Sequence, residues 1–253
     1  MHLDIQKANI WKRISAALLD VILLSVVVAF LAMLLSSVLG FDTYSNGLDD
    51  CYSKYEEQFG ISFDITMDEY NAMTQQEIDL YNRAYAEFTK DADAIYYFNM
   101  VIWLTIVIVS ISILLGYLAL EFAVPLFLKE GRTLGKKIFG IGLMRTHGIR
   151  INPVALFIRT FLGKFTIETM VPVLIILMIF WGTIGIVGPL VIAGILLLQL
   201  ILLATSRTNS MIHDRLSDTV VVDMESQLIF DTEDDLIEYT KRLHAEKASK
   251  QVY

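Results

Sequence analysis

Residues 14–39 read ISAALLDVILLSVVVAFLAMLLSSVL, an apolar run with a single charged residue, Asp20. The run is longer than the roughly 20 residues that a helix needs to cross a bilayer. It is also longer than a signal-peptide core, and no clear small-residue cleavage pattern ends it. We therefore predict that it is a retained transmembrane helix.

Three further apolar segments extend this pattern. Residues 99–120 form one span, and residues 166–206 carry one charge, Glu168, over a length that fits two spans and a short turn. We place the third span near 167–183 and the fourth near 189–205. The sequence thus predicts an all-α integral membrane protein, a four-helix transmembrane bundle with an interfacial cytoplasmic helix and a helical extracellular segment.

The predicted spans divide the chain into six segments. They are a cytoplasmic N-terminus with the first helix (1–40), an acidic extracellular helical segment (41–98), the second helix (99–128), a basic cytoplasmic loop with the interfacial helix (129–165), the third and fourth helices (166–206) and a cytoplasmic C-terminal segment (207–253), in which 231–250 form a charged helix.

Charge is distributed unevenly along the chain, whose formal net charge is −8. The stretch 41–98 holds thirteen acidic residues against three bases, whereas 129–164 holds eight bases and one acid. Basic residues favour the cytoplasmic ends of membrane helices. We therefore expect a multi-pass protein of the cell membrane with both termini in the cytoplasm. Because the bases flank apolar spans, we expect the lipid bilayer and not a nucleic acid as their partner.

Two local signals predict helix starts. Thr74 and Glu77 have the spacing of a capping box, and the helical pattern that follows runs without Gly or Pro into the second span. Asn152 and Pro153 fit an N-cap and a first helical position. In the helix after Pro153, apolar residues share one face and Arg159, Thr160 and Lys164 share the other, which is typical of a helix lying on a leaflet.

Several site classes are excluded by composition and spacing. Cys51 is the only cysteine, so an intramolecular disulfide and a cysteine-based zinc site are ruled out. The glycine-rich segment 131–145 lacks phosphate-loop spacing. His213 could titrate near neutrality, but no nucleophile or metal-ligand spacing accompanies it. We expect no enzyme, no cofactor and no metal centre.

Three motifs together resemble the RDD family of small multi-pass membrane proteins, named for one arginine and two aspartates. They are KRISAALLD at 12–20, GRTLGKKIFGI at 131–141 and IHDRLSDTVVV at 212–222. On this resemblance the naming residues are Arg13, Asp20 and Asp214. The resemblance implies a role in transport, since some members are described as sodium/proton antiporters, while others look like accessory domains. The long acidic segment departs from the compact family pattern.

Asp20 is the main candidate for chemistry. It lies about 9 Å inside the first span at helical rise, so its charge must be paired, neutralised or hydrated. It either bonds helices together or binds a cation or proton. Glu121, Glu168 and Gln199 fall at similar depth and could join it in an ion or proton site, because oxygen ligands suit hard cations.

Arg13 is a less suitable partner for Asp20, because the two lie about 10.5 Å apart along the helix and Arg13 should extend toward the interface. We expect Arg13 to meet Asp214 instead and to clamp the first helix to the segment after the last. The alternative is an arginine that faces lipid phosphate.

Three functions remain open at this stage, and the third of them is a sensor of an external ligand. The first is exchange of a small monovalent cation such as Na+ for H+. The second is a non-catalytic scaffold that binds a partner through the extracellular helices or the cytoplasmic tail. The small number of spans suggests that a transporter of this kind forms a homo-oligomer or works with another membrane protein.

Overall fold

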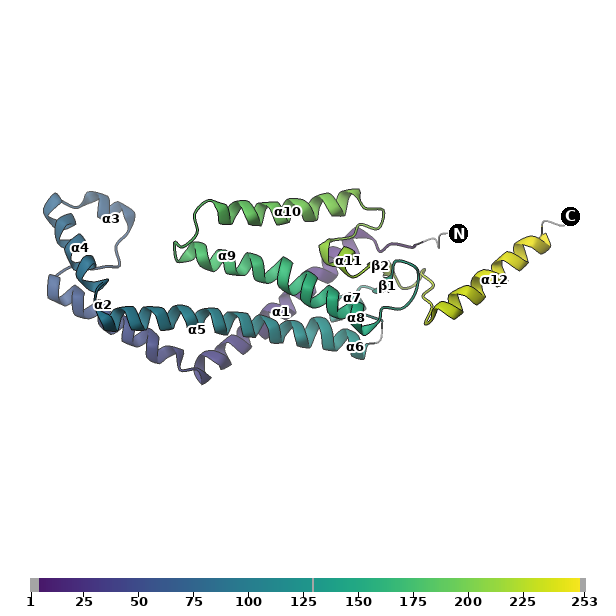
Figure 1. The fold of residues 1–253 in the computed structure, drawn as a ribbon, viewed down its shortest axis with the longest axis horizontal. Coiled ribbons are helices and arrows are strands. Elements are labelled where there is room, and N and C mark those ends of the chain that lie inside the picture. Colours follow the sequence, from purple (N-terminus) through teal and green to yellow (C-terminus); the bar gives the residue numbers. More distant parts are fainter. Residues whose placement is uncertain (1–4, 129, 251–253) are drawn as a thin grey trace. The chain divides into compact units, whose positions relative to one another are not determined.

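The computed structural model describes residues 5–128 and 130–250, and most of it is helical. Four helical runs are long and apolar enough to cross a membrane, namely Ile10–Val38, Ala92–Phe127, Pro153–Phe180 and Val187–Thr205. Most of their side chains are not buried against protein, as expected for helices surrounded by lipid. The predicted all-α membrane fold with four spans is confirmed (Figure 1).

Two compact units make up the chain. The first contains residues 1–28 and 113–253, and the second contains residues 29–112. Helices α1 (Ile10–Val38) and α5 (Ala92–Gly116) each belong in part to both units. The second unit therefore comprises the acidic segment and the ends of two spans.

The second unit folds around aromatic side chains. Helix α2 (Phe41–Phe59) contacts α4 (Gln75–Phe88), and α3 (Met67–Ala72) lies between them in sequence. The predicted capping box at Thr74 and Glu77 starts α4, and a second one starts α3. The core consists of Cys51, Tyr55, Phe88 and Ala94, with Tyr52, Phe59, Phe63 and Tyr97 packed against it.

The expectation that α4 continues into the second span is wrong. Helix α4 ends at Phe88, and α5 begins at Ala92. Asp91 separates them, because its Oδ1 accepts hydrogen bonds from the backbone N–H groups of Asp93 (2.8 Å) and Ala94 (3.4 Å). That is the geometry of an N-cap, which starts a new helix.

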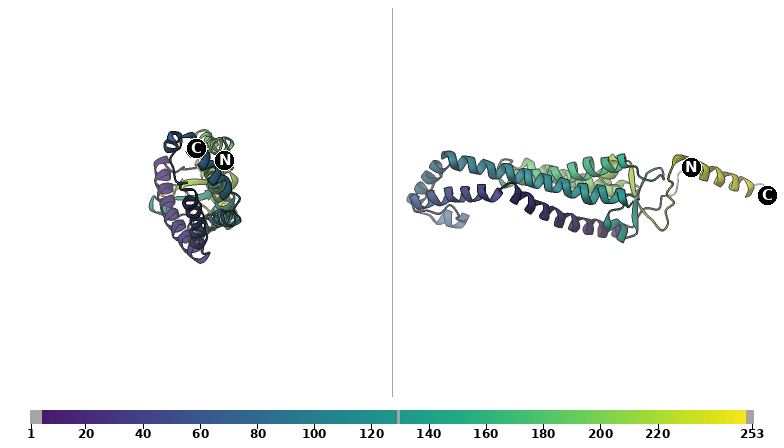
Figure 2. Two further views of the ribbon diagram at one scale, coloured as in Figure 1. Left: turned by 90° about the vertical axis from the view of Figure 1, so that its left-hand side faces the viewer. Right: turned by 90° about the horizontal axis from the view of Figure 1, so that it is seen from below.

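The second span extends past α5 through η1 (Tyr117–Ala123), a π-helical stretch, to α6 (Val124–Phe127). The right-hand view of Figure 2 shows this run along its length. Short π-helical stretches are rare and often lie at functional sites. Here the stretch carries Glu121.

The third span differs from the predicted one. Asn152 caps α8 (Pro153–Phe157) as expected, but α8 continues through the π-helical η2 (Ile158–Met170) into α9 (Val171–Phe180). The predicted interfacial helix is thus the start of the third span. Its polar face points into the protein, where Arg159 and Thr160 are 3% and 1% exposed, while the apolar Val154 is 65% exposed. This inward orientation is favourable because Arg159 pairs with Asp214 and Thr160 hydrogen bonds to the backbone oxygen of Glu121.

The fourth span, α10 (Val187–Thr205), follows α9 after a short turn, and the two helices lie antiparallel (Figure 1). A small sheet that the sequence analysis did not predict then forms from β1 (Ile141–Arg145) and β2 (Thr219–Asp223). The strands are antiparallel, with Leu143 opposite Val221. Three short or charged helices complete the unit: α7 (Leu134–Ile138), α11 (Ile212–Leu216) and α12 (Glu233–Lys250).

Candidate functional site

Asp20 lies on α1 and faces the glycine-rich segment around α7. Its Oδ2 accepts a hydrogen bond from the Thr133 hydroxyl, and its Oδ1 accepts one from the backbone N–H of Gly135 (2.8 Å). The ammonium of Lys136 is 3.9 Å from Oδ2. Asp20 is therefore paired, as its depth in an apolar helix requires.

Gly135 is needed for this approach. A Cβ at Gly135 would lie 2.3 Å from the backbone oxygen of Ala16 and 2.8 Å from Asp20 Oδ1. Both contacts are too close for any side chain, so only glycine lets the start of α7 reach the carboxylate. The glycine-rich segment, which has no phosphate-loop spacing, thus binds a carboxylate of its own chain.

Glu121 forms the second ion pair of the site. Its carboxylate is 2.6 Å from the ammonium of Lys164 on η2, and its side chain is 9% exposed. The hydroxyl of Thr160 donates to the backbone oxygen of Glu121 (3.0 Å). Because α-helical hydrogen bonds shift in a π-helix, a backbone oxygen there is available for such a side-chain donor. The π-helical stretches η1 and η2 therefore contact each other at Glu121, through Lys164 and Thr160.

Asp20 and Glu121 line one small cavity. Its other lining residues are Leu23, Leu120 and Leu134, and its volume is about 10 Å³. That volume is near the minimum that holds one water molecule. Both carboxylates act on the Lys136 ammonium. Burial, together with the Lys164 charge, lowers the pKa of Lys136 to about 8, although the negative charges of Glu121 and Asp20 favour its charged form.

Asp214 on α11 is the centre of a second cluster. Its Oδ1 accepts a hydrogen bond from Arg159 Nη1, and its Oδ2 lies 3.4 Å from Arg13 Nη2. Arg159 also donates to the Thr219 hydroxyl (2.8 Å), and Arg13 to the backbone oxygen of Thr208 (3.2 Å). Burial raises the pKa of Asp214, but the Arg159, His213 and Arg13 charges and the Met211 N–H together outweigh burial and hold the pKa well below its ordinary value.

Glu168 and Gln199 belong to a third group around His213. Both carboxylate oxygens of Glu168 are 2.8 Å from His213 Nδ1, and Glu168 also accepts the backbone N–H of His213 (3.1 Å). Gln199 hydrogen bonds to Glu168 and accepts the backbone N–H of Ile212 (3.2 Å). The close packing of α11 on η2 depends on Gly163, whose Cβ would lie 2.5 Å from His213 Cβ.

The four candidates for an ion or proton site are thus divided. Asp20 and Glu121 share a cavity, whereas Glu168 and Gln199 share His213. The expected contact between Arg13 and Asp214 is present, and no ion pair joins Arg13 to Asp20 in the described part of the chain. Within residues 5–128 and 130–250, no group of three or more His, Cys, Asp or Glu side chains is placed to hold a metal ion.

Sequence reasoning missed the basic half of the site. Three of the four carboxylates pair with lysine or arginine side chains that were expected only to set orientation or to face a leaflet. These bases are Lys136 at Asp20, Lys164 at Glu121 and Arg159 at Asp214. The available signal was polar residues at helical spacing on the third run, which fits a buried face as well as a solvated one.

A family model described as the RDD family matches residues 7–218. The chain belongs to the RDD family. No curated protein and no solved structure matches it. In this RDD protein the three motif residues have two different environments: Arg13 and Asp214 contact each other, whereas Asp20 binds the glycine-rich motif. All three motifs therefore meet in the first unit.

Proposed function

We propose that this RDD protein transports a small monovalent cation such as Na+ in exchange for protons, with Asp20 and Glu121 at the cation site. One observation carries the proposal: these two carboxylates come from different helices and line the same small cavity within the apolar runs. Carboxylate oxygens are the ligands that hard cations prefer. Buried ionisable side chains in membrane helices commonly mark ion or proton pathways.

Charge balance supports coupling to protons. Lys136 and Lys164 already neutralise the two carboxylates. A cation that enters the cavity adds one positive charge to a balanced, poorly solvated set, which is unfavourable unless a proton leaves. The size of the cavity favours a cation no larger than a water molecule. The proposal requires no enzymatic activity and no cofactor.

Proton movement in liposomes tests this proposal. Purified protein is reconstituted with a trapped pH dye, and Na+, Li+ or K+ is added outside. We expect cation-dependent proton efflux that falls at least tenfold in Asp20→Asn and in Glu121→Gln. Glu87→Gln, an exposed carboxylate of the second unit, is the matched control and keeps full flux. Absence of flux in the wild type, or full flux in Asp20→Asn, would contradict the proposal.

A non-catalytic scaffold is the second candidate. The observation in its favour is that every carboxylate of the site already has a partner, which a purely structural network also explains. In that case the variants lose stability and no wild-type flux exists. For either function we propose that both termini lie in the cytoplasm and the acidic segment 41–98 outside, with a second copy or another membrane protein as partner.

A further inference from the structure

A larger pocket lies on the first unit, away from the carboxylate cavity. Its volume is about 280 Å³, close to the lower end of the range for small-molecule sites. It is lined by strand β1, by the segment after β2 and by two charged side chains. The lining residues are Glu130, Leu143, Arg150, Met224, Gln227, Leu228 and Ile229.

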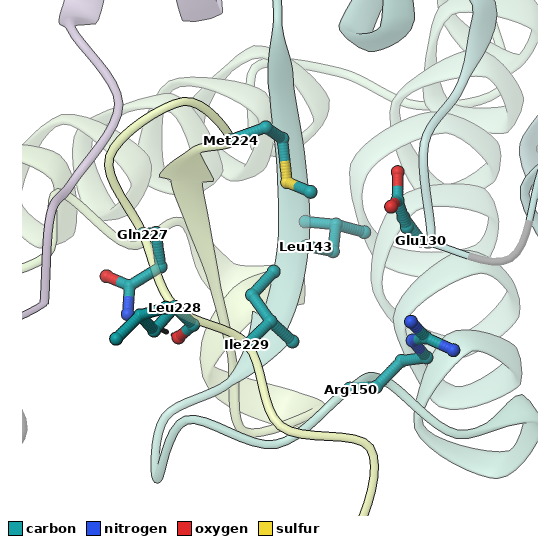
Figure 3. A pocket seen from close by; sticks show the side chains of 7 residues that line it. All are labelled: Glu130, Leu143, Arg150, Met224, Gln227, Leu228 and Ile229. Atoms are coloured by element: carbon teal, nitrogen blue, oxygen red, sulfur yellow. Dashed lines mark hydrogen bonds between the residues drawn. The ribbon is translucent and has the colours of Figure 1, made fainter.

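The pocket has a charged side and an apolar side. Figure 3 shows Glu130 and Arg150 together on one side and Leu143, Met224 and Ile229, here termed the apolar wall, facing them. Gln227 lies beyond this wall and is occupied, since it accepts the backbone N–H of Gln6 (2.7 Å) and donates to the backbone oxygen of Leu228 (2.7 Å). Ligand recognition therefore depends on the two charges and the apolar wall.

Both charges have partners behind them. Glu130 forms an ion pair with Arg132, and Arg150 Nη2 is 2.9 Å from Asp231 Oδ1. Arg150 Nε, however, is buried and has no hydrogen-bond partner among the described residues. The Arg150 side chain as a whole is 40% exposed, so its guanidinium remains open to a further acceptor from the pocket.

The carboxylate of Glu130, the guanidinium of Arg150 and the apolar wall together define the class of ligand that fits the pocket. One acid and one base leave the pocket without net charge, so a ligand of either sign would unbalance it. A zwitterion matches both side chains at once, and charge-assisted hydrogen bonds to each are the strong ones. The apolar wall adds a requirement for an aliphatic group.

We propose that this pocket binds a small zwitterion that carries an aliphatic group. Its ammonium lies beside Glu130, its anionic group pairs with the Arg150 guanidinium, and its aliphatic group contacts the apolar wall. Two sources have this chemistry. One is a free aliphatic α-amino acid, and the other is phosphatidylethanolamine, whose headgroup is the zwitterion and whose acyl chain is the aliphatic group.

Binding to the full chain in phosphatidylcholine nanodiscs tests the proposal. Calorimetry is run with leucine and methionine, and with two analogues of leucine: 4-methylpentanoate, which lacks the ammonium, and 3-methylbutylamine, which lacks the carboxylate. A lipid arm uses nanodiscs that contain phosphatidylethanolamine. We expect saturable binding of one zwitterion class and at least tenfold weaker binding of both analogues.

Variants locate the site. Arg150→Gln and Glu130→Gln should each weaken binding at least tenfold, and Met224→Phe should block it by filling the pocket. Ile229→Phe gives the same test if Met224→Phe does not fold. Arg242→Gln, an exposed arginine on α12 that pairs with Glu238, is the matched control and leaves binding unchanged. Absence of binding by every zwitterion, equal binding of the analogues, or full binding in the filled pocket would overturn the proposal.

Discussion

Arg159 on η2 donates a hydrogen bond to the Asp214 carboxylate on α11, and the two side chains are 3% and 1% exposed. The pair joins the third span to the segment after the fourth. Because neither side chain is hydrated, the charged form of each is stabilised mainly by the opposite charge of the other. This pair, together with its neighbours, determines how the first unit responds to substitution.

Breaking the Arg159–Asp214 pair should be strongly destabilising. We expect Asp214→Ala or Arg159→Met to cost about 3–5 kcal/mol, because each leaves an uncompensated buried charge. The double variant should cost much less than the sum of the two. Unfolding in detergent, followed by circular dichroism, measures these values. The exposed pair Glu238–Arg242 serves as a control with an expected coupling of about 0.3–0.5 kcal/mol. Additive losses at Arg159 and Asp214 would refute the coupling.

Arg13 should couple to Asp214 more weakly than Arg159 does. Its Nη2 is 3.4 Å from the carboxylate, which is long for a charge-assisted hydrogen bond. We expect a coupling energy between Arg13→Ala and Asp214→Ala of about 0.5–1.5 kcal/mol, at the lower end of the range for residues in contact. The same unfolding assay measures it. A coupling larger than that of Arg159 would show that the first helix, and not the third, carries the clamp.

His213 should make stability depend on pH. Burial lowers the pKa of His213 below its ordinary value near 6.5, and the Arg159 charge lowers it further, although Asp214 and Glu168 oppose both effects. The folded state then binds fewer protons than the unfolded state below about pH 6.5, so stability falls as the pH decreases through that region. We expect the thermal midpoint to drop between pH 7.5 and pH 5.5.

The His213→Gln variant isolates this effect. It keeps a side-chain donor for Glu168 but does not titrate, so its thermal midpoint should change less over the same interval. An equal pH dependence in wild type and variant would assign the effect to another group. His147, which is largely exposed, provides the control substitution His147→Gln.

Asp91 should stabilise the second unit in two separable ways. Its Oδ1 caps α5, and its Oδ2 accepts from Lys54 Nζ (3.0 Å) and Tyr55 Oη (2.9 Å) on α2. The Lys54 and Tyr55 hydrogen bonds lower the pKa of Asp91 to about 2. Its contribution is therefore complete above about pH 4 and is lost as the pH falls through 2.

Two variants separate the cap from the charge. Asp91→Asn keeps an N-cap side chain and should lose less stability than Asp91→Ala, which removes both functions. Hydrogen exchange at the start of α5 is the measurement, because local opening there reports on the cap. Equal exchange in the two variants would show that the cap contributes nothing.

Reporter fusions test the proposed orientation. A reporter inserted at Gly60, which follows α2 in a left-handed conformation and where an added Cβ would meet no other atom within 4 Å, should behave as external. A reporter after Tyr253 should behave as cytoplasmic, because basic residues flank the ends of the spans on that side. The opposite result at either site would contradict the proposed orientation.

The sequence by itself determined the membrane class, the number of spans and the helix starts after Thr74 and Asn152. Each of these follows from local properties. An apolar run of sufficient length must cross the bilayer as a helix, and an N-cap such as Asn152 acts on residues three positions away. The contact between Arg13 and Asp214 was also predictable, because topology alone brings both residues to the same end of the bundle.

Only the tertiary structure decided which buried charges meet. Arg159 and Lys164 have a spacing that suits a leaflet surface, and their inward orientation depends on Asp214 and Glu121, which are distant in sequence. The role of Gly135 likewise depends on the close approach of Asp20. A charge in an apolar helix must find a partner, which the sequence shows, but the partner is selected by packing between helices, which a single sequence does not record.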